Sequence, residues 1–121
     1  MARILIVDDM VTIRRIVKTL LTELGHEIEE ADSGVTGYQA ACGGQFDLVI
    51  SDWNMPRGSG TDLVRELKRN AATRDVPVVM LTAEAERSRI VELAQLGVRG
   101  YILKPFKPET LTKAVTAALQ K

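Results

Sequence analysis

The sequence predicts an α/β protein built on a doubly wound, five-stranded parallel sheet with five helices. Short apolar runs alternate along the chain with segments whose apolar residues recur at helical spacing. The apolar runs are almost continuous, which is typical of strands that are buried on both faces of a parallel sheet. Right-handed connections between such strands place helices on both faces, so we expect a three-layer sandwich.

The first strand is expected at about residues 3–7. The helix that follows ends at Gly25, because glycine readily adopts the left-handed conformation that closes a helix. The second strand, about 26–31, is polar on one side and is therefore predicted to be an edge strand. The first helix is predicted from an apolar stripe at Ile13, Ile16, Val17, Leu20, Leu21 and Leu24.

Ser33 is a suitable N-cap for a second helix at about residues 34–42, which Gly43-Gly44 would stop. The third strand is the apolar run at residues 48–51. A third helix is expected at about residues 61–70, where the apolar positions are Leu63, Val64 and Leu67.

The fourth strand is expected at residues 78–81, and a fourth helix at about 86–96 would end at Gly97. The fifth strand is expected at about residues 100–103. Proline is favoured in the first turn of a helix, so the fifth helix is predicted to begin near Pro108. Its apolar positions are Leu111, Ala114, Val115, Ala118 and Leu119.

Composition narrows the class of protein. A chain of 121 residues fits one domain, so we expect a single domain over residues 1–121 with no output domain. Equal numbers of acidic and basic residues argue against a nucleic-acid binder, which needs a basic excess. With Cys42 as the only cysteine there is no internal disulfide, which suits a reducing cytoplasm, and Cys42 is expected to be a small core residue. No apolar run approaches the ~18 residues that cross a bilayer.

Four charged residues stand where predicted strands end. Asp8 and Asp9 follow the first strand, Asp52 follows the third and Lys104 follows the fifth. Parallel strands have their carboxyl ends at one edge of the sheet, and open α/β sheets bind ligands there. We therefore expect the four side chains to share one pocket.

The charges of this pocket predict a divalent cation. Two carboxylates ~4 Å apart repel by about 4 kcal/mol at an effective dielectric constant of 20. Mg²⁺ takes oxygen ligands and also accepts phosphate oxygens, so it is the expected cofactor. Asp52 can then act as a nucleophile and become an aspartyl phosphate. The hydroxyl of Thr82 and the backbone N–H of Ala83, at the end of the fourth strand, are expected to donate to the new phosphoryl oxygens.

Each of these residues also has a structural interpretation. Asp8 or Asp9 can cap the first helix. Asp52 can be part of an Asx-turn, and Lys104 can be a solvated surface residue. It is the occurrence of all four at strand ends that favours a functional site. The single histidine, His26, is expected at the surface, and one histidine with one cysteine makes no zinc site.

At this point the sequence resembles the receiver domains of two-component response regulators over essentially its whole length. Within that family it is most similar to the CheY-type, single-domain chemotaxis regulators. The resemblance implies a flavodoxin-like fold with strand order 2-1-3-4-5. It is carried by Val7-Asp8-Asp9, Arg14-Arg15-Ile16-Val17, Ser51-Asp52-Trp53-Asn54-Met55-Pro56, Thr82-Ala83-Glu84-Ala85, Gly100-Tyr101 and Lys104-Pro105-Phe106.

The resemblance implies that Asp52 is the phosphoacceptor. It implies that Asp9 and Asp52 bind Mg²⁺ through their side chains, Asn54 through its backbone carbonyl and Asp8 through water. Lys104 is expected to contact the phosphoryl group, and the Lys104-Pro105 peptide bond is expected to be cis.

The resemblance also implies a switch and a lifetime control. Thr82 is expected to move toward the phosphoryl group while Tyr101 turns inward. Asn54 and Glu84 would flank the path of the hydrolytic water and set how long the phosphoryl group persists.

The implied partners are a cognate histidine kinase, a protein target and, for some relatives, a phosphatase. For CheY-type regulators the target is the flagellar motor switch protein. The chain would act as a monomer and as a signalling switch rather than a turnover enzyme. The expected binding surface is built by the fourth helix, fifth strand and fifth helix, and presents Arg87, Glu92, Arg99, Tyr101, Lys107 and Lys113.

Two features depart from the CheY pattern. The segment Arg57-Gly58-Ser59-Gly60 lacks the acidic residue that precedes its last glycine in CheY, which bears on metal affinity and phosphatase recognition. Glu86 stands where CheY has a lysine, which bears on the identity of the target.

Two other functions remain open from the sequence. The chain can be a phosphate sink or a phosphorelay shuttle without a motor target. It can also be a Mg²⁺-dependent phosphatase of haloacid-dehalogenase type, although those enzymes place a second aspartate two residues after the nucleophile, where this chain has Asn54.

Overall fold

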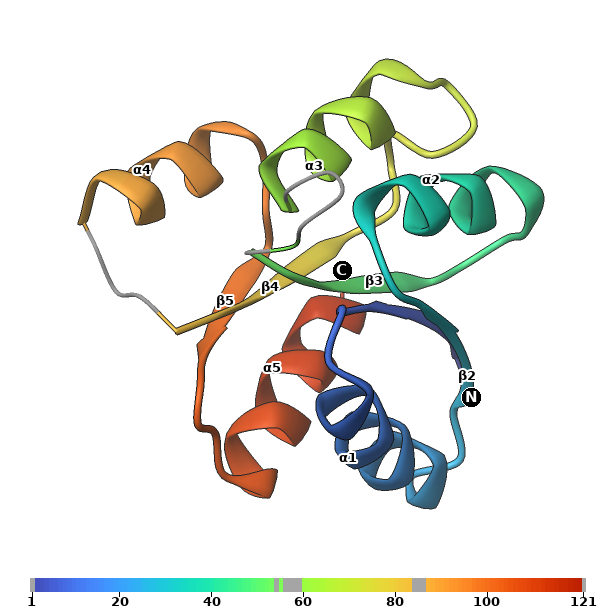
Figure 1. Ribbon diagram of the computed structural model, residues 1–121, viewed down its shortest axis with the longest axis vertical. Coiled ribbons are helices and arrows are strands. Elements are labelled where there is room, and N and C mark those ends of the chain that lie inside the picture. Colours follow the sequence, from blue (N-terminus) through green and yellow to red (C-terminus); the bar gives the residue numbers. More distant parts are fainter. Residues whose placement is uncertain (1, 54, 56–59, 84–86, 121) are drawn as a thin grey trace.

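Parallel strands form the centre of the molecule. The computed structural model describes residues 2–53, 55, 60–83 and 87–120. Within these residues five strands form one sheet in the order β2-β1-β3-β4-β5, which confirms the predicted order (Figure 1). The strands are β1 (Arg3–Val7), β2 (Glu27–Ala31), β3 (Leu48–Asp52), β4 (Val78–Thr82) and β5 (Gly100–Leu103).

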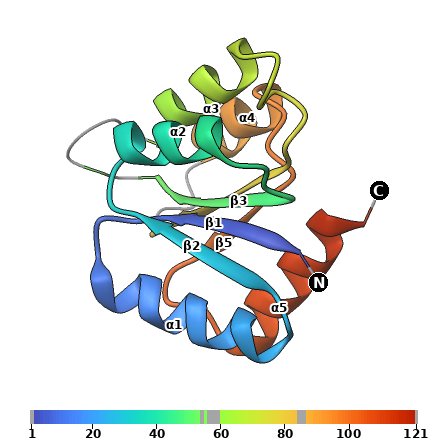
Figure 2. The same ribbon diagram turned by 90° about the vertical axis from the view of Figure 1, so that its right-hand side faces the viewer.

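Helices cover both faces of the sheet, as predicted. One face is covered by α1 (Val11–Glu23) and α5 (Pro108–Leu119). The other is covered by α2 (Gly34–Gly43), α3 (Gly60–Arg69) and α4 (Arg87–Gln95). Figure 2 shows the three layers from the side. None of the helices in the described ranges combines the length and the apolar composition that a bilayer span requires.

Two apolar cores lie against the two faces of the sheet. On β1, Ile4 and Ile6 pack toward α1 and α5, whereas Leu5 and Val7 pack toward the other helices. All four are completely buried. Burying one such side chain stabilises the fold by about 1.5–3 kcal/mol. The central strands are therefore rigid supports for the residues that follow them.

The edge strand β2 has a different pattern. Only its last residue, Ala31, is buried, which confirms the predicted edge position. The strand begins at Glu27, one residue later than predicted, where its pairing with Arg3 of β1 begins. The Nδ1 atom of His26 accepts a hydrogen bond from the backbone N–H of Ala2 at 3.1 Å. His26 is half-buried, so it lies at the surface as predicted but is partly covered.

Helix ends follow the predicted signals. Gly25 and Gly97 adopt positive φ angles of 92° and 83° and close α1 and α4. Ser33 caps α2: its Oγ accepts from the backbone N–H of Thr36 at 3.1 Å, and Thr36 Oγ1 accepts from the N–H of Ser33 at 3.0 Å. This reciprocal pair is a capping box, which satisfies donors at the start of the helix.

The prediction that Cys42 is a core residue was wrong. Cys42 is exposed, because α2 buries Gly34, Gly37 and Ala41 and the next residue points away from that face. The apolar stripe that predicts α1 does form a helix, in which Val17 and Leu21 are fully buried while Ile16 remains 44% exposed. The apolar side of a helix can be wider than the part that packs against the sheet, so residues at its margins stay exposed.

The start of α3 lies against the end of β3. Gly60 donates its backbone N–H to the Trp53 carbonyl at 2.9 Å. A methyl group on Gly60 would overlap the Asp52 carbonyl oxygen and the Met80 Cε atom, and would lie 3.1 Å from the Cα atom of Trp53. Only glycine fits this close approach of a helix to the strand end.

Gly60→Ala is therefore expected to lower the free energy of unfolding by about 3 kcal/mol, the upper range for overpacking. Urea denaturation measures this. Gly43→Ala is the matched control, because its added methyl group would have no neighbour within 4 Å. The control is expected to be neutral or slightly stabilising. Equal stabilities for the two variants would contradict the tight contact at Gly60.

Candidate functional site

Three carboxylates meet at the carboxyl edge of the sheet. β1 and β3 are neighbours, and Val7 pairs with Ser51, so Asp8 and Asp52 are the next residues along both strands. Asp8 is completely buried, Asp52 is 6% exposed and Asp9 is exposed. One oxygen from each of the three carboxylates lies within 4.8 Å of the others. The structure thus brings together the acidic residues singled out in the sequence.

Lys104 supplies the positive charge of this cluster. It follows β5, and its backbone N–H donates to the Thr82 carbonyl at 2.8 Å. Its Nζ atom lies 3.0 Å from Asp8 Oδ2 and 3.0 Å from Asp52 Oδ1. Its side chain is 16% exposed, so it is no solvated surface lysine. The peptide bond between Lys104 and Pro105 is cis.

The cluster has more acidic than basic groups. Burial raises the pKa of Asp52, and the charges of Asp8 and Asp9 act in the same direction, while Lys104 opposes them. Burial lowers the pKa of Lys104, but its hydrogen bonds to Asp8 and Asp52 and their charges outweigh this and raise the pKa. One ammonium group does not neutralise three carboxylates, so the site favours a further cation.

The donor set fits a hard divalent cation. The oxygens of Asp8, Asp9 and Asp52 are close enough for one ion, and carboxylate oxygen is the ligand type that such ions take. Asp9 lies at the exposed side of the cluster, where an ion and its water can enter.

Asp8 belongs to the carboxylate cluster and does not cap α1. Its Oδ1 atom accepts from the backbone N–H of Met10 at 2.9 Å, and its own N–H donates to the Ala31 carbonyl at 3.1 Å. The N-cap of α1 is Met10, without a side-chain cap. The alternative in which Asp8 or Asp9 caps this helix is thus wrong.

The residues of the expected switch lie on neighbouring strands. Thr82 is the last residue of β4 and is 4% exposed. It pairs with Leu103 of β5, whereas Tyr101 pairs with Met80 and is 43% exposed. Ala83 follows β4 and is exposed. Tyr101 therefore lies outward in this structure.

Some expected residues lie outside the described part of the chain. These are Asn54, Glu84, Glu86 and the segment 56–59, and the side chain of Arg87 is likewise not described. On the expected binding surface Arg99, Lys107 and Lys113 are exposed. Glu92 instead pairs with Arg65 of α3 at 3.6 Å and so is partly engaged within the fold.

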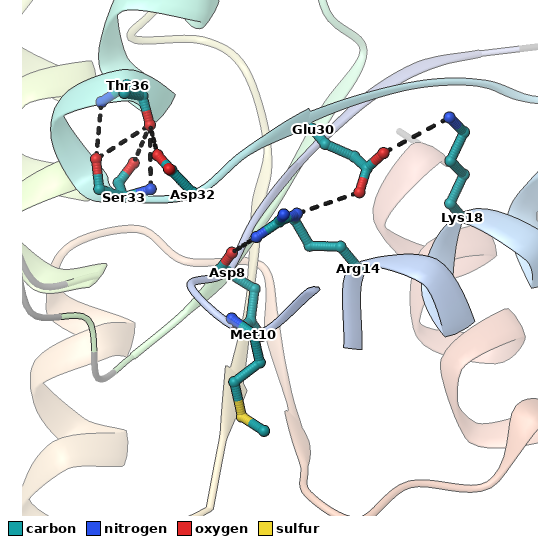
Figure 3. A network of polar contacts seen from close by, with 8 residues as sticks. All are labelled: Asp8, Met10, Arg14, Lys18, Glu30, Asp32, Ser33 and Thr36. Carbon is teal, nitrogen blue, oxygen red and sulfur yellow. Dashed lines mark hydrogen bonds and ion pairs between the residues drawn. The ribbon is translucent and has the colours of Figure 1, made fainter. Parts of the chain in front are cut away.

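Reasoning from the sequence missed Arg14. Its Nη1 atom donates to the Asp8 carbonyl oxygen at 2.6 Å, and its Nε atom donates to Glu30 of β2 at 3.1 Å (Figure 3). The pattern of charges does not separate Arg14 from its exposed neighbour Arg15, since both follow the strand end on the same helix.

Comparisons with known proteins agree with this geometry. Residues 4–116 match the family described as the response regulator receiver domain. The chain is 46% identical to the chemotaxis protein CheY-3 of Vibrio cholerae serotype O1, over 98% of this chain and 92% of that protein. It is 43% identical to the chemotaxis protein CheY of Pseudomonas aeruginosa, over 98% and 97% respectively.

Solved structures show the same fold. The chemotaxis protein CheY4 of Vibrio cholerae superposes with a TM-score of 0.93 at 36% identity, covering 98% of both chains. The receiver domain of a sensor histidine kinase from Pseudomonas aeruginosa PAO1, with a magnesium ion coordinated in its active-site cleft, gives a TM-score of 0.90 at 25% identity over 99% of this chain and 98% of that one. This chain therefore belongs to the response regulator receiver domain family and is similar to CheY-type chemotaxis regulators.

Proposed function

We propose that this protein is a phosphorylation-activated switch in which Asp52 accepts a phosphoryl group from a histidine kinase. The observation that carries the proposal is that the Asp52 carboxylate lies beside those of Asp8 and Asp9 and 3.0 Å from the ammonium group of Lys104. A nucleophile, a cation-binding group and a fixed positive charge thus lie within one small site. The protein would act as a signalling switch in the cytoplasm rather than as a turnover enzyme.

The transfer forms one bond and breaks one. A carboxylate oxygen of Asp52 bonds to phosphorus while phosphorus separates from the donor, and the donor atom leaves with the electron pair. The donor atom is a histidine nitrogen in the kinase or the acyl oxygen in acetyl phosphate. Lys104 faces the phosphoryl oxygens and neutralises part of their charge, and such positioning supplies most of the catalysis in phosphoryl transfer.

Asp8, Asp9 and Asp52 would hold Mg²⁺. A bound Mg²⁺ would supply charge neutralisation for the carboxylates and for the incoming phosphoryl oxygens. The receiver domain of the sensor kinase described above holds magnesium in its active-site cleft, which supports the choice of ion. Asn54 is proposed to contribute its backbone carbonyl.

The switch would operate through Thr82 and Tyr101. A phosphoryl group adds an acceptor that the hydroxyl and the Ala83 N–H can satisfy only in one arrangement. The equilibrium then shifts by the difference in contact free energy between the two arrangements. Tyr101, outward in this structure, would turn inward and reshape the surface of α4, β5 and α5. Asn54 and Glu84 are proposed to set the lifetime of the phosphoryl group.

The proposed target is the flagellar motor switch protein, because the curated relatives are chemotaxis proteins. The exposed cations Lys107 and Lys113 make the α4–β5–α5 surface suited to an acidic partner segment, whereas Arg99 donates to the carbonyl oxygens of Ala118 and Gln120 at the end of α5. A phosphate sink would use the same acceptor site without this partner.

The test uses acetyl phosphate with and without Mg²⁺. Mass spectrometry is expected to show one added phosphoryl group per chain with Mg²⁺ and none with a chelator, and peptide mapping is expected to place it on Asp52. Trp53, which is next to Asp52 and only 9% exposed, is expected to report both steps by fluorescence. A wild-type protein that takes no label with Mg²⁺ present would contradict the proposal.

A second arm tests the output. Purified motor switch protein is expected to bind the labelled form more tightly than the unlabelled form. Equal binding of the two forms would support the phosphate sink instead.

A further inference from the structure

We propose that Arg14, held by Glu30, is a positioning residue that fixes Asp8 and thereby sets the affinity of the carboxylate cluster for a divalent cation. This inference rests on the proposed function, because it assigns residues that support the same cation site. Figure 3 shows the guanidinium group of Arg14 between the strand end at Asp8 and the carboxylate of Glu30.

Arg14 links three elements of the fold. It lies in α1, donates to the Asp8 carbonyl oxygen at 2.6 Å after β1, and donates to Glu30 Oε1 of β2 at 3.1 Å. Its side chain is 16% exposed and that of Glu30 is 30% exposed. A planar guanidinium with two fixed contacts has little freedom to move, so its position is defined from two sides.

Glu30 is in turn held by a second cation. Lys18 Nζ, one turn further along α1, lies 3.6 Å from Glu30 Oε2. The Lys18 side chain is 50% exposed and pairs with Glu30 rather than with Asp8. Lys18 therefore supports the carboxylate without reaching the site.

The contact with Arg14 completes the hydrogen bonding of Asp8. The Asp8 N–H donates to Ala31, Oδ1 accepts from Met10, Oδ2 accepts from Lys104 and the carbonyl accepts from Arg14. Asp8 is completely buried when Arg14 is in place, so loss of the guanidinium would leave its carbonyl without this donor. The strand end would then shift to regain a partner, and the carboxylate would move with it.

Glu30 also controls where the positive charge of Arg14 lies. The pairing holds the guanidinium on the main-chain oxygen of Asp8, whereas Lys104 contacts the carboxylate of that residue. Without Glu30, the guanidinium is free to turn toward the carboxylates, where it would compete with a divalent cation. Glu30 thus holds Arg14 in place and keeps its positive charge away from the carboxylates of the site.

The test measures Mg²⁺ affinity from the fluorescence of Trp53, with Mg²⁺ alone as the probe. Groups that orient metal ligands typically change metal affinity by 10–100-fold when they are removed. Arg14→Gln is expected to raise the Mg²⁺ midpoint by about tenfold. Arg14→Lys is expected to behave similarly, because an ammonium group lacks the fork that spans Asp8 and Glu30. Glu30→Gln is expected to raise the midpoint as well.

Two matched controls separate position from charge. Arg15→Gln changes the net charge by the same amount on an adjacent, exposed residue, and Lys18→Gln removes the other partner of Glu30. Both midpoints are expected to stay within about twofold of wild type, because exposed charges are screened by salt. Thermal unfolding without Mg²⁺ shows whether each variant is folded.

The outcomes are separable. A folded Arg14→Gln variant with the wild-type midpoint overturns the inference, as does an equal effect of Arg15→Gln. If Arg14→Gln does not fold, Glu30→Gln decides, because it retains the guanidinium. A wild type that binds Mg²⁺ but takes no phosphoryl group refutes the proposed function alone. A wild type for which neither fluorescence nor thermal stability responds to Mg²⁺ refutes both.

Discussion

Asp52→Asn is expected to abolish the Mg²⁺-dependent incorporation of phosphate from acetyl phosphate. The amide keeps the shape of the carboxylate and can still accept from Lys104, but its oxygen is a poor nucleophile. Mass spectrometry of the intact chain measures the loss. Asp47→Asn is the control, since it makes the same substitution beside the other end of β3, where Asp47 Oδ2 accepts from the backbone N–H of Arg3. Full labelling of the Asp52 variant would refute Asp52 as the acceptor.

The same substitution is expected to stabilise the metal-free protein by about 1 kcal/mol, as removing a strained functional group often does. Burial and the charges of Asp8 and Asp9 raise the pKa of Asp52 above 3.8. A raised pKa means that the folded protein binds this proton more tightly than the unfolded chain does. Ionisation of Asp52 therefore lowers stability as the pH rises from about 3.8 through the folded pKa.

The gain from Asp52→Asn should thus be full at neutral pH and should vanish below pH 3.8, where the carboxyl is protonated in both states. Urea denaturation in the presence of a chelator measures it. Mg²⁺ is expected to stabilise wild type more than the variant, because the variant has lost one carboxylate ligand. A gain that is the same at all pH values would contradict an electrostatic origin.

The second large effect is expected for Lys104→Met, which should lower the free energy of unfolding by about 2 kcal/mol at neutral pH. The ammonium group contacts Asp8 and Asp52 at 3.0 Å each, and its removal leaves buried carboxylates without their fixed counter-charge. Breaking a fully buried pair in this way costs about 3–5 kcal/mol, and the partial exposure of Lys104 reduces the cost. Mg²⁺ is expected to restore part of the loss.

The pH dependence follows from the same charges. The pKa of Lys104 is raised in the fold, so its contribution is fully present below the unfolded pKa of 10.5 and is lost as the pH rises through the folded value. At acid pH Asp52, whose pKa is raised by burial, is protonated, and the difference between wild type and variant should shrink there. Urea denaturation across this range measures both limits.

Lys107→Met is the control for Lys104→Met. It makes the same substitution on an exposed lysine three residues further along. Surface substitutions of this kind usually change stability by less than about 0.5 kcal/mol. If the Lys107 variant lost as much stability as the Lys104 variant, the loss would reflect charge in general rather than the contacts in the site.

The strands could be predicted from the sequence because a strand that is buried on both faces of a sheet is an almost continuous apolar run. β1 and β5 have the predicted bounds, and β3 and β4 each extend one residue further. The additional residues, Asp52 and Thr82, are polar, so an apolar run could not include them. Both are nevertheless buried, because the sheet continues to the edge where the site is formed.

The site could be predicted to the extent that it follows from strand ends. Asp8, Asp52 and Lys104 meet because parallel strands place their carboxyl ends together, whatever the helices do. Arg14 could not be found in this way, since its contact depends on the position of α1 relative to β2. The spacing of the apolar residues shows which side of the helix faces the sheet. It does not show which of two adjacent arginines contacts a strand end.

The exposed margin of β2 has a consequence for how molecules of this protein meet one another. Glu27, Glu29 and Glu30 follow one another closely along that strand. Each of these carboxylates pairs with a cation of its own chain: Arg3 with Glu27 and Glu29, and Arg14 and Lys18 with Glu30. A second copy that added its own β2 here would have to fit its charged side chains among these ion pairs, which opposes the growth of an extended sheet from chain to chain. We therefore expect this charged border to disfavour edge-to-edge aggregation in a concentrated solution of the protein.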